Sequence, residues 1–347
     1  MPVIAESHLR TICRTIVLAM GAPADIAEIV TDVLVKADLK GVDSHGCRLL
    51  HENYMRNVNA GRLLPGARAE VTAQDGATTI MDGRWGFGHP PARMAAQHAI
   101  EAARRLGIGA ASLIHVVHIA RLGEYAEQIA AQNMLGIIMC HAGPVTTPYG
   151  GMKRMFGTNP LAIAVPRPGG RTLLADWATS AKSVNKLMIY RQRGQELADD
   201  IVLDKNGHPT TDPAAFFDGG MLAAFGGYKG YALNLFIEII GGLILGAGCG
   251  SLLDRHPGNG SLFIALDIAR WRSPDAFSDE LEQLLSATKS VPLAPGADEV
   301  LLPGEMEERA EAERRRNGIP LDDVIWTELQ ETAGALHLPA TLFAQPG

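Results

Sequence analysis

Apolar residues recur at helical spacing along the first forty residues of the chain. Between residues 23 and 38 they return every three or four positions, which is typical of an amphipathic helix. Residues 7–20 show the same pattern and predict an earlier helix. A short polar loop with Ser44 and His45 follows, and a third helix is expected to begin near Leu49. The start of the chain is therefore predicted to be helical.

From Gly83 onward, helical and extended patterns alternate. Helices are expected over residues 92–103, 121–132, 231–245, 278–288 and 305–317, and strands over residues 107–117, 136–140, 161–165, 172–176 and 262–266. A glycine-rich loop at residues 219–230 leads into the apolar helix at 231–245, and the last two helices, which are charged, are expected to close the chain. This alternation indicates a mixed α/β fold.

The composition bears on the possible partners. The formal net charge is −7, and no basic stripe is present that would neutralise the phosphates of a nucleic acid. The basic residues 314–316 lie among glutamates and are typical of a solvated helix face. The most apolar stretch, residues 231–249, contains Asn234 and Glu238 and predicts a buried helix, because a membrane span needs about 20 largely uncharged residues. We expect no nucleic-acid partner and no membrane insertion.

The cysteines indicate a reducing compartment. Cys13, Cys47, Cys140 and Cys249 are far apart and form no C-x-x-C pair, which favours neither a zinc knuckle nor a disulfide framework. Reduced thiols in the cytoplasm agree with this spacing. Polar residues between positions 6 and 10 also interrupt the apolar run that a signal peptide needs, so a cytoplasmic location is predicted.

The common nucleotide and hydrolase motifs are absent from the sequence. A G-x-G-x-x-G fingerprint, which would place glycines in a strand-to-helix turn against a pyrophosphate, does not occur. Gly246, Gly248 and Gly250 approach this pattern, but they follow a helix and have the wrong third spacing. Walker A, H-E-x-x-H and G-x-S-x-G motifs are missing as well. A Rossmann domain is therefore not expected.

Five polar clusters remain as candidate sites. They are residues 43–48, 115–121, 157–160, 176–180 and 225–230. In the first, His45 stands next to Ser44 and near Arg48, a set that suits acid/base chemistry and a two-pronged grip on a carboxylate. In the second, His118 can exchange a proton near neutral pH, and Arg121 lies at a predicted helix start that is able to hold a phosphate. Taken singly, each cluster also agrees with an ordinary helix cap, turn or buried histidine.

Taken together and in order, these clusters resemble the malate/L-lactate dehydrogenase family that lacks a Rossmann fold. The matching segments are G-V-D-S-H-G at 41–46, H-I-A-R-L-G-E-Y at 118–125, G-T-N-P at 157–160, D-W-A-T-S at 176–180, P-T-T-D-P at 209–213, F-G-G-Y-K-G-Y-A-L at 225–233 and L-P-G-E at 302–305. The forms R-L-G-E-Y and F-G-G-x-K-G-Y-A-L, followed by E-I-I-G-G, are most similar to the hydroxycarboxylate dehydrogenase branch of that family.

The resemblance implies a fold, an assembly and a reaction. It implies a helical substrate and dimer domain of residues 1–80 with residues 290–347 packed on it, and a cofactor-binding α/β domain of residues 81–289 with a largely antiparallel sheet. It further implies an intertwined homodimer that transfers a hydride between a nicotinamide cofactor and a small 2-hydroxy or 2-oxo acid. NAD and NADP both remain open, with NAD favoured, and no metal is expected.

The resemblance also implies roles for individual residues. His118 is expected to be the acid/base, with Ser44 and His45 in the same pocket and Arg48 on the substrate carboxylate. The expected cofactor-binding residues are His118, Ile119, Arg121, Leu122, Thr158, Asp176, Trp177, Ala178, Lys229 and Gly304.

The chain departs from the family pattern at three places. The substrate arginine of the family stands four residues after the loop histidine, whereas here Leu49 occupies that place, Arg48 comes one residue earlier, and one extra residue precedes Tyr54. Ala120 replaces a glycine of the branch, and Asn185 replaces a glycine after the D-W-A-T-S segment.

Three alternative functions stay open at this point. The first is the reduction of the C=N bond of a cyclic imino acid, which needs the same hydride donor and carboxylate grip. The second is a metal-dependent lyase that would use His45, His51 and Asp43, whose spacing matches no compact ligand pattern. The third is a cofactor-binding protein without catalysis.

Overall fold

Two long helices form the first layer of the protein, whose computed structural model describes residues 1–253 and 258–344. Helix α1 covers Glu6–Ala19 and α2 covers Ala24–Leu39, so both expected helices are confirmed. A single 3-10 turn, Asp43–His45, follows. The third expected helix begins as a π-helix, η2 (Leu50–Met55), and ends as the short helix α3 (Arg56–Asn59).

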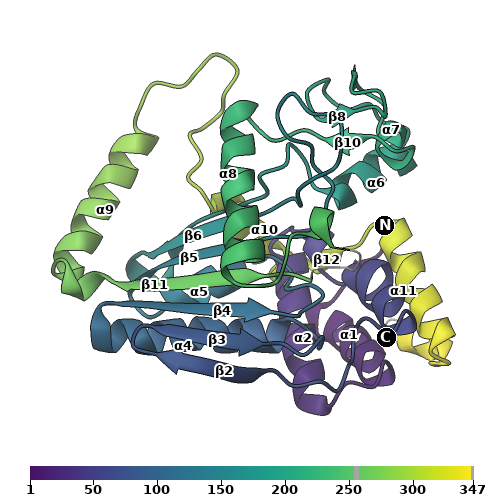
Figure 1. Cartoon of the computed structure of the whole chain (residues 1–347), viewed down its shortest axis with the longest axis horizontal. Coiled ribbons are helices and arrows are strands. Elements are labelled where there is room, and N and C mark those ends of the chain that lie inside the picture. Colours follow the sequence, from purple (N-terminus) through teal and green to yellow (C-terminus); the bar gives the residue numbers. More distant parts are fainter. Residues whose placement is uncertain (254–257, 345–347) are drawn as a thin grey trace.

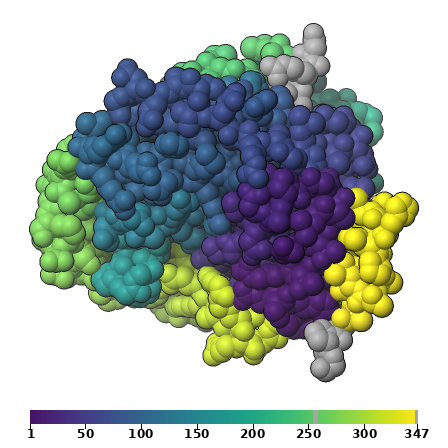
Figure 2. Space-filling model, turned by 90° about the horizontal axis from the view of Figure 1, so that it is seen from below, coloured from purple at the N-terminus to yellow at the C-terminus, as the bar shows by residue number. Residues whose placement is uncertain are grey.

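The far end of the chain packs against these helices. Helix α10 (Glu305–Asn317), strand β12 (Ile319–Pro320) and helix α11 (Asp323–Ala335) lie beside α1 and α2, and Figure 2 shows the yellow C-terminal helix against the purple N-terminal ones. Strand β1 (Val3–Ile4) pairs antiparallel with β12. Side chains from both ends share one apolar core, in which Leu9, Leu34 and Leu329 are fully buried. The expectation that two helices close the chain was wrong, because α11 follows them.

A seven-stranded sheet forms the second layer (Figure 1). Its order is β2-β3-β4-β11-β5-β6-β7, with the strands Glu70–Asp75, Thr78–Asp82, Ile108–Ile114, Ser261–Asp267, Met134–Cys140, Leu161–Pro166 and Thr172–Trp177 in that order. Only β3 and β4 pair in parallel, and the other neighbours are antiparallel. This mixed, largely antiparallel sheet confirms the fold class. The β2–β3 hairpin was not expected.

Helices α4 (His89–Leu106) and α5 (Gly123–Ala130) pack on this sheet. Alanines on one side of α4 allow close approach to the strands, and the core between them contains Ile138 and Phe263 at zero exposure. The two large cores draw on different sets of elements. The division into domains at residues 80 and 289 stays a prediction, and the hairpin at 70–82 belongs to the sheet.

A small subdomain lies between strand β7 and the next long helix in the sequence. It contains α6 (Val184–Gln192), α7 (Ala214–Phe217) and a three-stranded sheet of β8 (Val202–Leu203), β9 (Pro209–Thr210) and β10 (Met221–Leu222). Its own core is built around Leu187, Val202 and Phe216. None of these elements was expected from the sequence.

Helix α8 (Tyr228–Glu238) continues as a π-helix, η4 (Ile239–Ile244). The expectation of a buried helix here was wrong, because Phe236 is 62% exposed and Ile244 is 70% exposed. The physical reason is that α8 turns its polar residues Asn234 and Glu238 inward, where both accept hydrogen bonds from Nδ2 of Asn159, and turns apolar residues outward. In the parts of the chain that the structure describes, no helix is long and apolar enough to span a membrane. Helix α9 (Pro274–Lys289) stands apart at the edge of the molecule in Figure 1.

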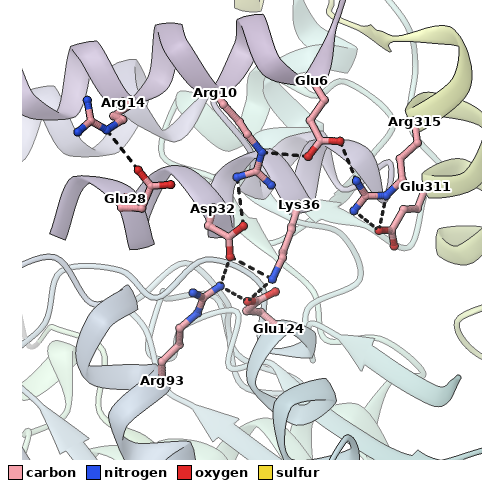
Figure 3. A network of polar contacts seen from close by, with 10 residues as sticks. All are labelled: Glu6, Arg10, Arg14, Glu28, Asp32, Lys36, Arg93, Glu124, Glu311 and Arg315. Atoms are coloured by element: carbon pink, nitrogen blue, oxygen red, sulfur yellow. Dashed lines mark hydrogen bonds and ion pairs between the residues drawn. The ribbon is translucent and has the colours of Figure 1, made fainter. Parts of the chain in front are cut away.

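A chain of ion pairs connects the two layers (Figure 3). Asp32 on α2 binds Arg10 of α1, Lys36 of its own helix and Arg93 of α4. Arg93 also bonds to Glu124 on α5 at 2.5 Å. The pull of Arg93 and Lys36 outweighs burial and lowers the pKa of Asp32 to about 2. The helical layer is thereby fixed to the helices that cover the sheet.

Candidate active site

The polar loop after α2 is held by a buried carboxyl group. Asp38 has no exposed surface, and its Oδ2 accepts the backbone N–H of Cys47 at 2.8 Å. A Cβ atom at Gly46 would lie 1.8 Å from Oδ1 of Asp38, so only glycine fits at this position. Burial raises the pKa of Asp38 to about 7, and the charge of Asp43 adds to the shift. The carboxyl group thus shapes the loop that carries Ser44 and His45.

The same loop is held from outside by α10 and α6. Arg314 donates to the carbonyl oxygen of Asp38 and to Oδ1 of Asp43. Asn185, near the start of α6, donates from Nδ2 to the carbonyl oxygen of Ser44 at 2.7 Å. Neither residue was expected in this role, although the sequence marked Asn185 as a departure from the family pattern. Three elements far apart in the sequence therefore fix the position of the loop.

Two histidines face one another beside this loop. The ring centroids of His45 and His118 are 5.7 Å apart, and both side chains are partly accessible to solvent. Oγ of Ser44 lies 2.9 Å from Nδ1 of His45. Desolvation lowers the pKa of His45 to about 4, with smaller contributions from the positive charges of Arg121 and Lys186. The structure thus brings together the three residues expected to carry the chemistry.

The ring of His118 is oriented by its own backbone. Nδ1 of His118 accepts the N–H of Ala120 at 2.9 Å. Ala120 reaches this position with φ at 58°, the left-handed region in which glycine is favoured. Desolvation, followed by the charges that His45 and His89 would carry, lowers the pKa of His118 well below its ordinary value. The ring is therefore neutral at pH 7, and with Nδ1 occupied as an acceptor its proton lies on Nε2.

A buried tyrosine and histidine support this pair. The hydroxyl of Tyr54 lies 2.9 Å from Nε2 of His89, and the ring of Tyr54 meets that of His118 edge-on with centroids 6.5 Å apart. Tyr54 belongs to the π-helix η2, and a π-turn accommodates one additional residue within a helix. The extra residue noted before Tyr54 thus falls in a turn that can accommodate it. His89 was missed by sequence reasoning, which had only a Pro-Pro helix start to read there.

Arg48 is already paired within the protein. Its side chain is 1% exposed, and its guanidinium lies 3.3 Å from Oε2 of Glu328 on α11 and 3.5 Å from Oε1 of Glu52. Desolvation raises the pKa of Glu328, and the charge of Arg48 opposes that rise. Two carboxylates of the protein therefore neutralise Arg48, the residue that was expected to bind the substrate carboxylate.

The expected phosphate seat at the start of α5 is occupied by a carboxylate. Oδ2 of Asp176, near the end of β7, accepts the N–H of Gly123 at 2.7 Å. Arg121 is buried, pairs with Glu127 through Nη2 and has no hydrogen-bond partner at Nε within the described residues. Desolvation raises the pKa of Asp176 to about 6, against the pull of Arg121. Ile119 and Leu122, from the same segment, are buried.

A network of amides joins two further clusters. The backbone N–H of Thr179 donates to the carbonyl oxygen of Thr158 at 2.9 Å. Asn159, the residue after Thr158, donates from Nδ2 to Oδ1 of Asn234. The network thus connects the G-T-N-P and D-W-A-T-S segments, where Trp177 and Ala178 are half-buried.

The last two expected positions lie beside these segments. The N–H of Phe225 donates to the carbonyl oxygen of Thr179 at 3.0 Å, so the loop that carries the exposed Lys229 begins there. Gly304 has φ at 89° and precedes α10, and its Cα lies against Leu174 of β7. Loops 118–122, 158–159, 176–179, 225–229 and 304 thus meet around β7 and α5. Among the described residues, no three His, Cys, Asp or Glu side chains gather as a metal site would require.

Comparison with known proteins places this arrangement in context. A family model described as malate/L-lactate dehydrogenase matches residues 4–330. The chain is 32% identical to an L-sulfolactate dehydrogenase of Methanothermobacter thermautotrophicus, over 94% of this chain and 95% of that protein. It is also 32% identical to hydroxycarboxylate dehydrogenase B of Escherichia coli O157:H7, over 95% of this chain and 93% of that protein.

Solved structures agree with these sequence matches. The sulfolactate dehydrogenase of Methanocaldococcus jannaschii superposes with a TM-score of 0.88 at 30% identity, covering 97% of this chain and 98% of that one. A Δ1-piperideine-2-carboxylate reductase of Pseudomonas syringae superposes with a TM-score of 0.85 at 26% identity, covering 96% of this chain and 100% of that one.

Proposed function

The chain belongs to the malate/L-lactate dehydrogenase family and is an oxidoreductase of hydroxy acids, and from this premise we propose that it transfers a hydride between NAD and a small 2-hydroxy acid or its 2-oxo acid. The observation that carries the proposal is the pair of neutral histidines, His45 and His118, 5.7 Å apart beside Ser44. His45 belongs to the 3-10 turn after α2, and His118 lies on the loop that runs into α5, where the N–H of Gly123 donates to Asp176.

His118 is the proposed acid/base. When bound, the nicotinamide supplies or accepts the hydride at C2 of the substrate. Nε2 of His118 carries the proton of the neutral ring and faces away from the Nδ1 contact with Ala120, so it is the atom that donates to the 2-oxo oxygen. Ser44 and His45 line the same space and orient the substrate oxygen. Arg48, paired with two carboxylates, is assigned to holding α11 against η2.

The cofactor is proposed to lie along the loops that meet around β7. The residues that would hold it are Ile119, Arg121, Leu122, Thr158, Asp176, Trp177, Ala178, Lys229 and Gly304. The unpaired Nε of buried Arg121 and the exposed ammonium of Lys229 are suited to its phosphates. A carboxylate such as Asp176 bonds ribose hydroxyls and repels a 2'-phosphate, so NAD is proposed over NADP.

The assembly proposed is a homodimer in the cytoplasm. Helix α8 and η4 present Phe236, Leu243 and Ile244 to solvent on one face, each more than half exposed. A contiguous apolar face on a helix whose polar side is buried is typical of a subunit contact. The four cysteines are all free and buried, which suits a reducing compartment.

The second candidate is the reduction of a cyclic imino acid. The similarity to the Pseudomonas syringae reductase favours it, because that protein shares the fold over nearly the whole chain. An imine nitrogen takes up a proton where the 2-oxo oxygen would, so Nε2 of His118 serves either substrate. A cofactor-binding protein without catalysis is the third outcome that the experiment below can return.

The test is a spectrophotometric panel. Oxidation of NADH and of NADPH is followed at 340 nm with the purified protein and, in separate reactions, pyruvate, oxaloacetate, a bulkier 2-oxo acid and a cyclic imino acid. Turnover of a 2-oxo acid with NADH supports the proposal. Turnover of the imino acid alone selects the second candidate, and cofactor binding without any turnover selects the third.

A further inference from the structure

We propose that Lys186, on α6, binds the carboxylate of the substrate, in the place that the family pattern gives to an arginine of the catalytic loop. This inference rests on the proposed function and names the residue that grips the acid. It assigns to α6 a part in the site that neither the sequence motifs nor the comparisons give it. Three observations carry it.

The first observation is that the charge of Arg48 is already neutralised by carboxylates of the protein. Its guanidinium is 1% exposed and is matched by Glu328 on one side and Glu52 on the other. A substrate carboxylate would have to displace a buried ion pair, which is strongly unfavourable because a buried charge would lose its partner. Arg121, the second buried guanidinium near the histidines, pairs with Glu127 through Nη2, and its Nε, unpaired among the described residues, is assigned to the phosphates of the cofactor. The site therefore needs another cation for the acid group.

The second observation is that α6 is tied to the catalytic loop. The side chain of Asn185 donates to the carbonyl oxygen of Ser44 at 2.7 Å, although the two residues are 141 positions apart. Ser183 caps the helix by accepting the N–H of Lys186. The first turn of α6 is thus fixed on both sides, against the loop by Asn185 and at its own end by Ser183. Lys186 follows Asn185 directly and belongs to the same first turn of α6.

The third observation is that the ammonium of Lys186 is exposed and uncommitted. Within the described residues its Nζ makes no hydrogen bond and no ion pair. Lys182, four residues earlier, is engaged: its Nζ donates to the hydroxyl of Tyr190 and lies 4.4 Å from the centre of that ring. In agreement with this placement, the charge of Lys186 contributes to lowering the pKa of His45.

The chemistry of an ammonium fits a site for varied acids. Lysine is a compact point charge on a flexible stem and does not demand the planar, two-pronged geometry that arginine requires. A carboxylate held by Lys186 places C2 of a short acid near His45 and His118, while the rest of the acid stays free to vary. The proposed ligand class is therefore short 2-oxo acids with an ionised carboxylate at C1.

The test compares Lys186→Met with Lys182→Met as the matched control. KM and kcat are measured for pyruvate and for its neutral amide, and the Kd for NADH is measured by fluorescence. A hydrogen bond to a charged group contributes about 1.5–3 kcal/mol, so Lys186→Met is expected to raise KM for the acid roughly 10- to 100-fold. KM for the amide and the Kd for NADH stay unchanged, and Lys186→Arg restores most of the loss. Lys182→Met behaves as wild type.

Each other outcome identifies which idea fails. If the wild-type protein reduces 2-oxo acids and Lys186→Met keeps the preference for acid over amide, the assignment of Lys186 is overturned and the proposed function stands. If the Kd for NADH rises as much as KM, Lys186 serves the cofactor and the assignment is overturned as well. If the wild-type protein reduces no 2-oxo acid with either cofactor, the proposed function and this inference fall together.

Discussion

Replacing Asp38 by Asn is expected to change how the stability of the protein depends on pH. Asp38 is fully buried at the end of α2, bonds to the N–H of Cys47 through Oδ2, and has no partner at Oδ1 among the described residues. Its pKa is raised from 3.8 to about 7, mainly by burial. In the unfolded chain the same carboxyl group ionises near its ordinary value.

The sign and size of the effect follow from these two pKa values. Between pH 4 and pH 7 the folded state keeps a proton that the unfolded state has lost, so the contribution of Asp38 is fully present below pH 4 and is lost as pH rises through 7. A rise from 3.8 to about 7 corresponds to a loss of about 4 kcal/mol at most. Asparagine does not titrate, but its amide leaves one buried donor unpaired, which costs about 1–3 kcal/mol at every pH.

The two stability curves are therefore expected to cross. Asp38→Asn is the less stable protein at pH 4 and matches or exceeds wild type at pH 8, as measured by urea denaturation at four pH values. Asp25→Asn is the control, because Arg68 holds the pKa of Asp25 below 3.8 and its profile runs parallel to wild type over this range. Parallel curves for Asp38→Asn would refute the raised pKa and the account of the loop built on it.

Three further substitutions test other parts of the site. His118→Ala should lower kcat by about 10²- to 10⁴-fold while the Kd for NADH, measured by fluorescence, is kept; near-normal turnover would remove His118 from the mechanism. Gly46→Ala forces a Cβ against Asp38 and should cost about 1–3 kcal/mol in urea denaturation, and wild-type stability would contradict the close contact. Arg48→Met leaves the buried Glu328 without its partner and should cost about 2–4 kcal/mol, with KM for pyruvate kept in the folded fraction; a raised KM at unchanged stability would mean that Arg48 binds the substrate.

The parts of the fold that could be predicted are those with a strong period in the sequence. Helices α1, α2 and α4 bury one face, so their apolar residues recur at helical spacing. Strand β2 is exposed along its whole length, so it has no buried apolar face to mark it in the sequence. The β2–β3 hairpin was not predicted for this reason. Helix α6 buries only Leu187 and so shows no apolar stripe.

Helix α11 could have been found. Asp322 caps it by accepting the N–H of Val324, and Ile325, Leu329 and Ala333 recur every fourth residue along one face. The prediction that α8 is buried failed for a different reason. An apolar composition alone does not distinguish a helix buried inside one chain from a helix whose apolar face is exposed on that chain.

The candidate site divides in the same way. Ser44, His45 and His118 stand within short motifs, so local sequence sufficed to select them. Arg48 and Glu328, which pair, are 280 positions apart, and no local sequence pattern predicts this contact. The bond from Asn185 to Ser44 is equally distant in sequence. Contacts of this kind are set by the way helices pack, which one sequence alone does not reveal.

The pairing of β1 with β12 also sets an order of events during protein synthesis. Val3 pairs with Pro320, so strand β1 cannot pair with β12 until residues 319 and 320 have been translated. Arg314, which holds the catalytic loop, emerges almost as late. Contacts this distant in sequence form slowly, because the intervening chain must be ordered first. A ribosome-bound chain that stops short of Arg314 can build its sheet, but its catalytic loop lacks this support, so activity is expected to arise only after Arg314 has emerged.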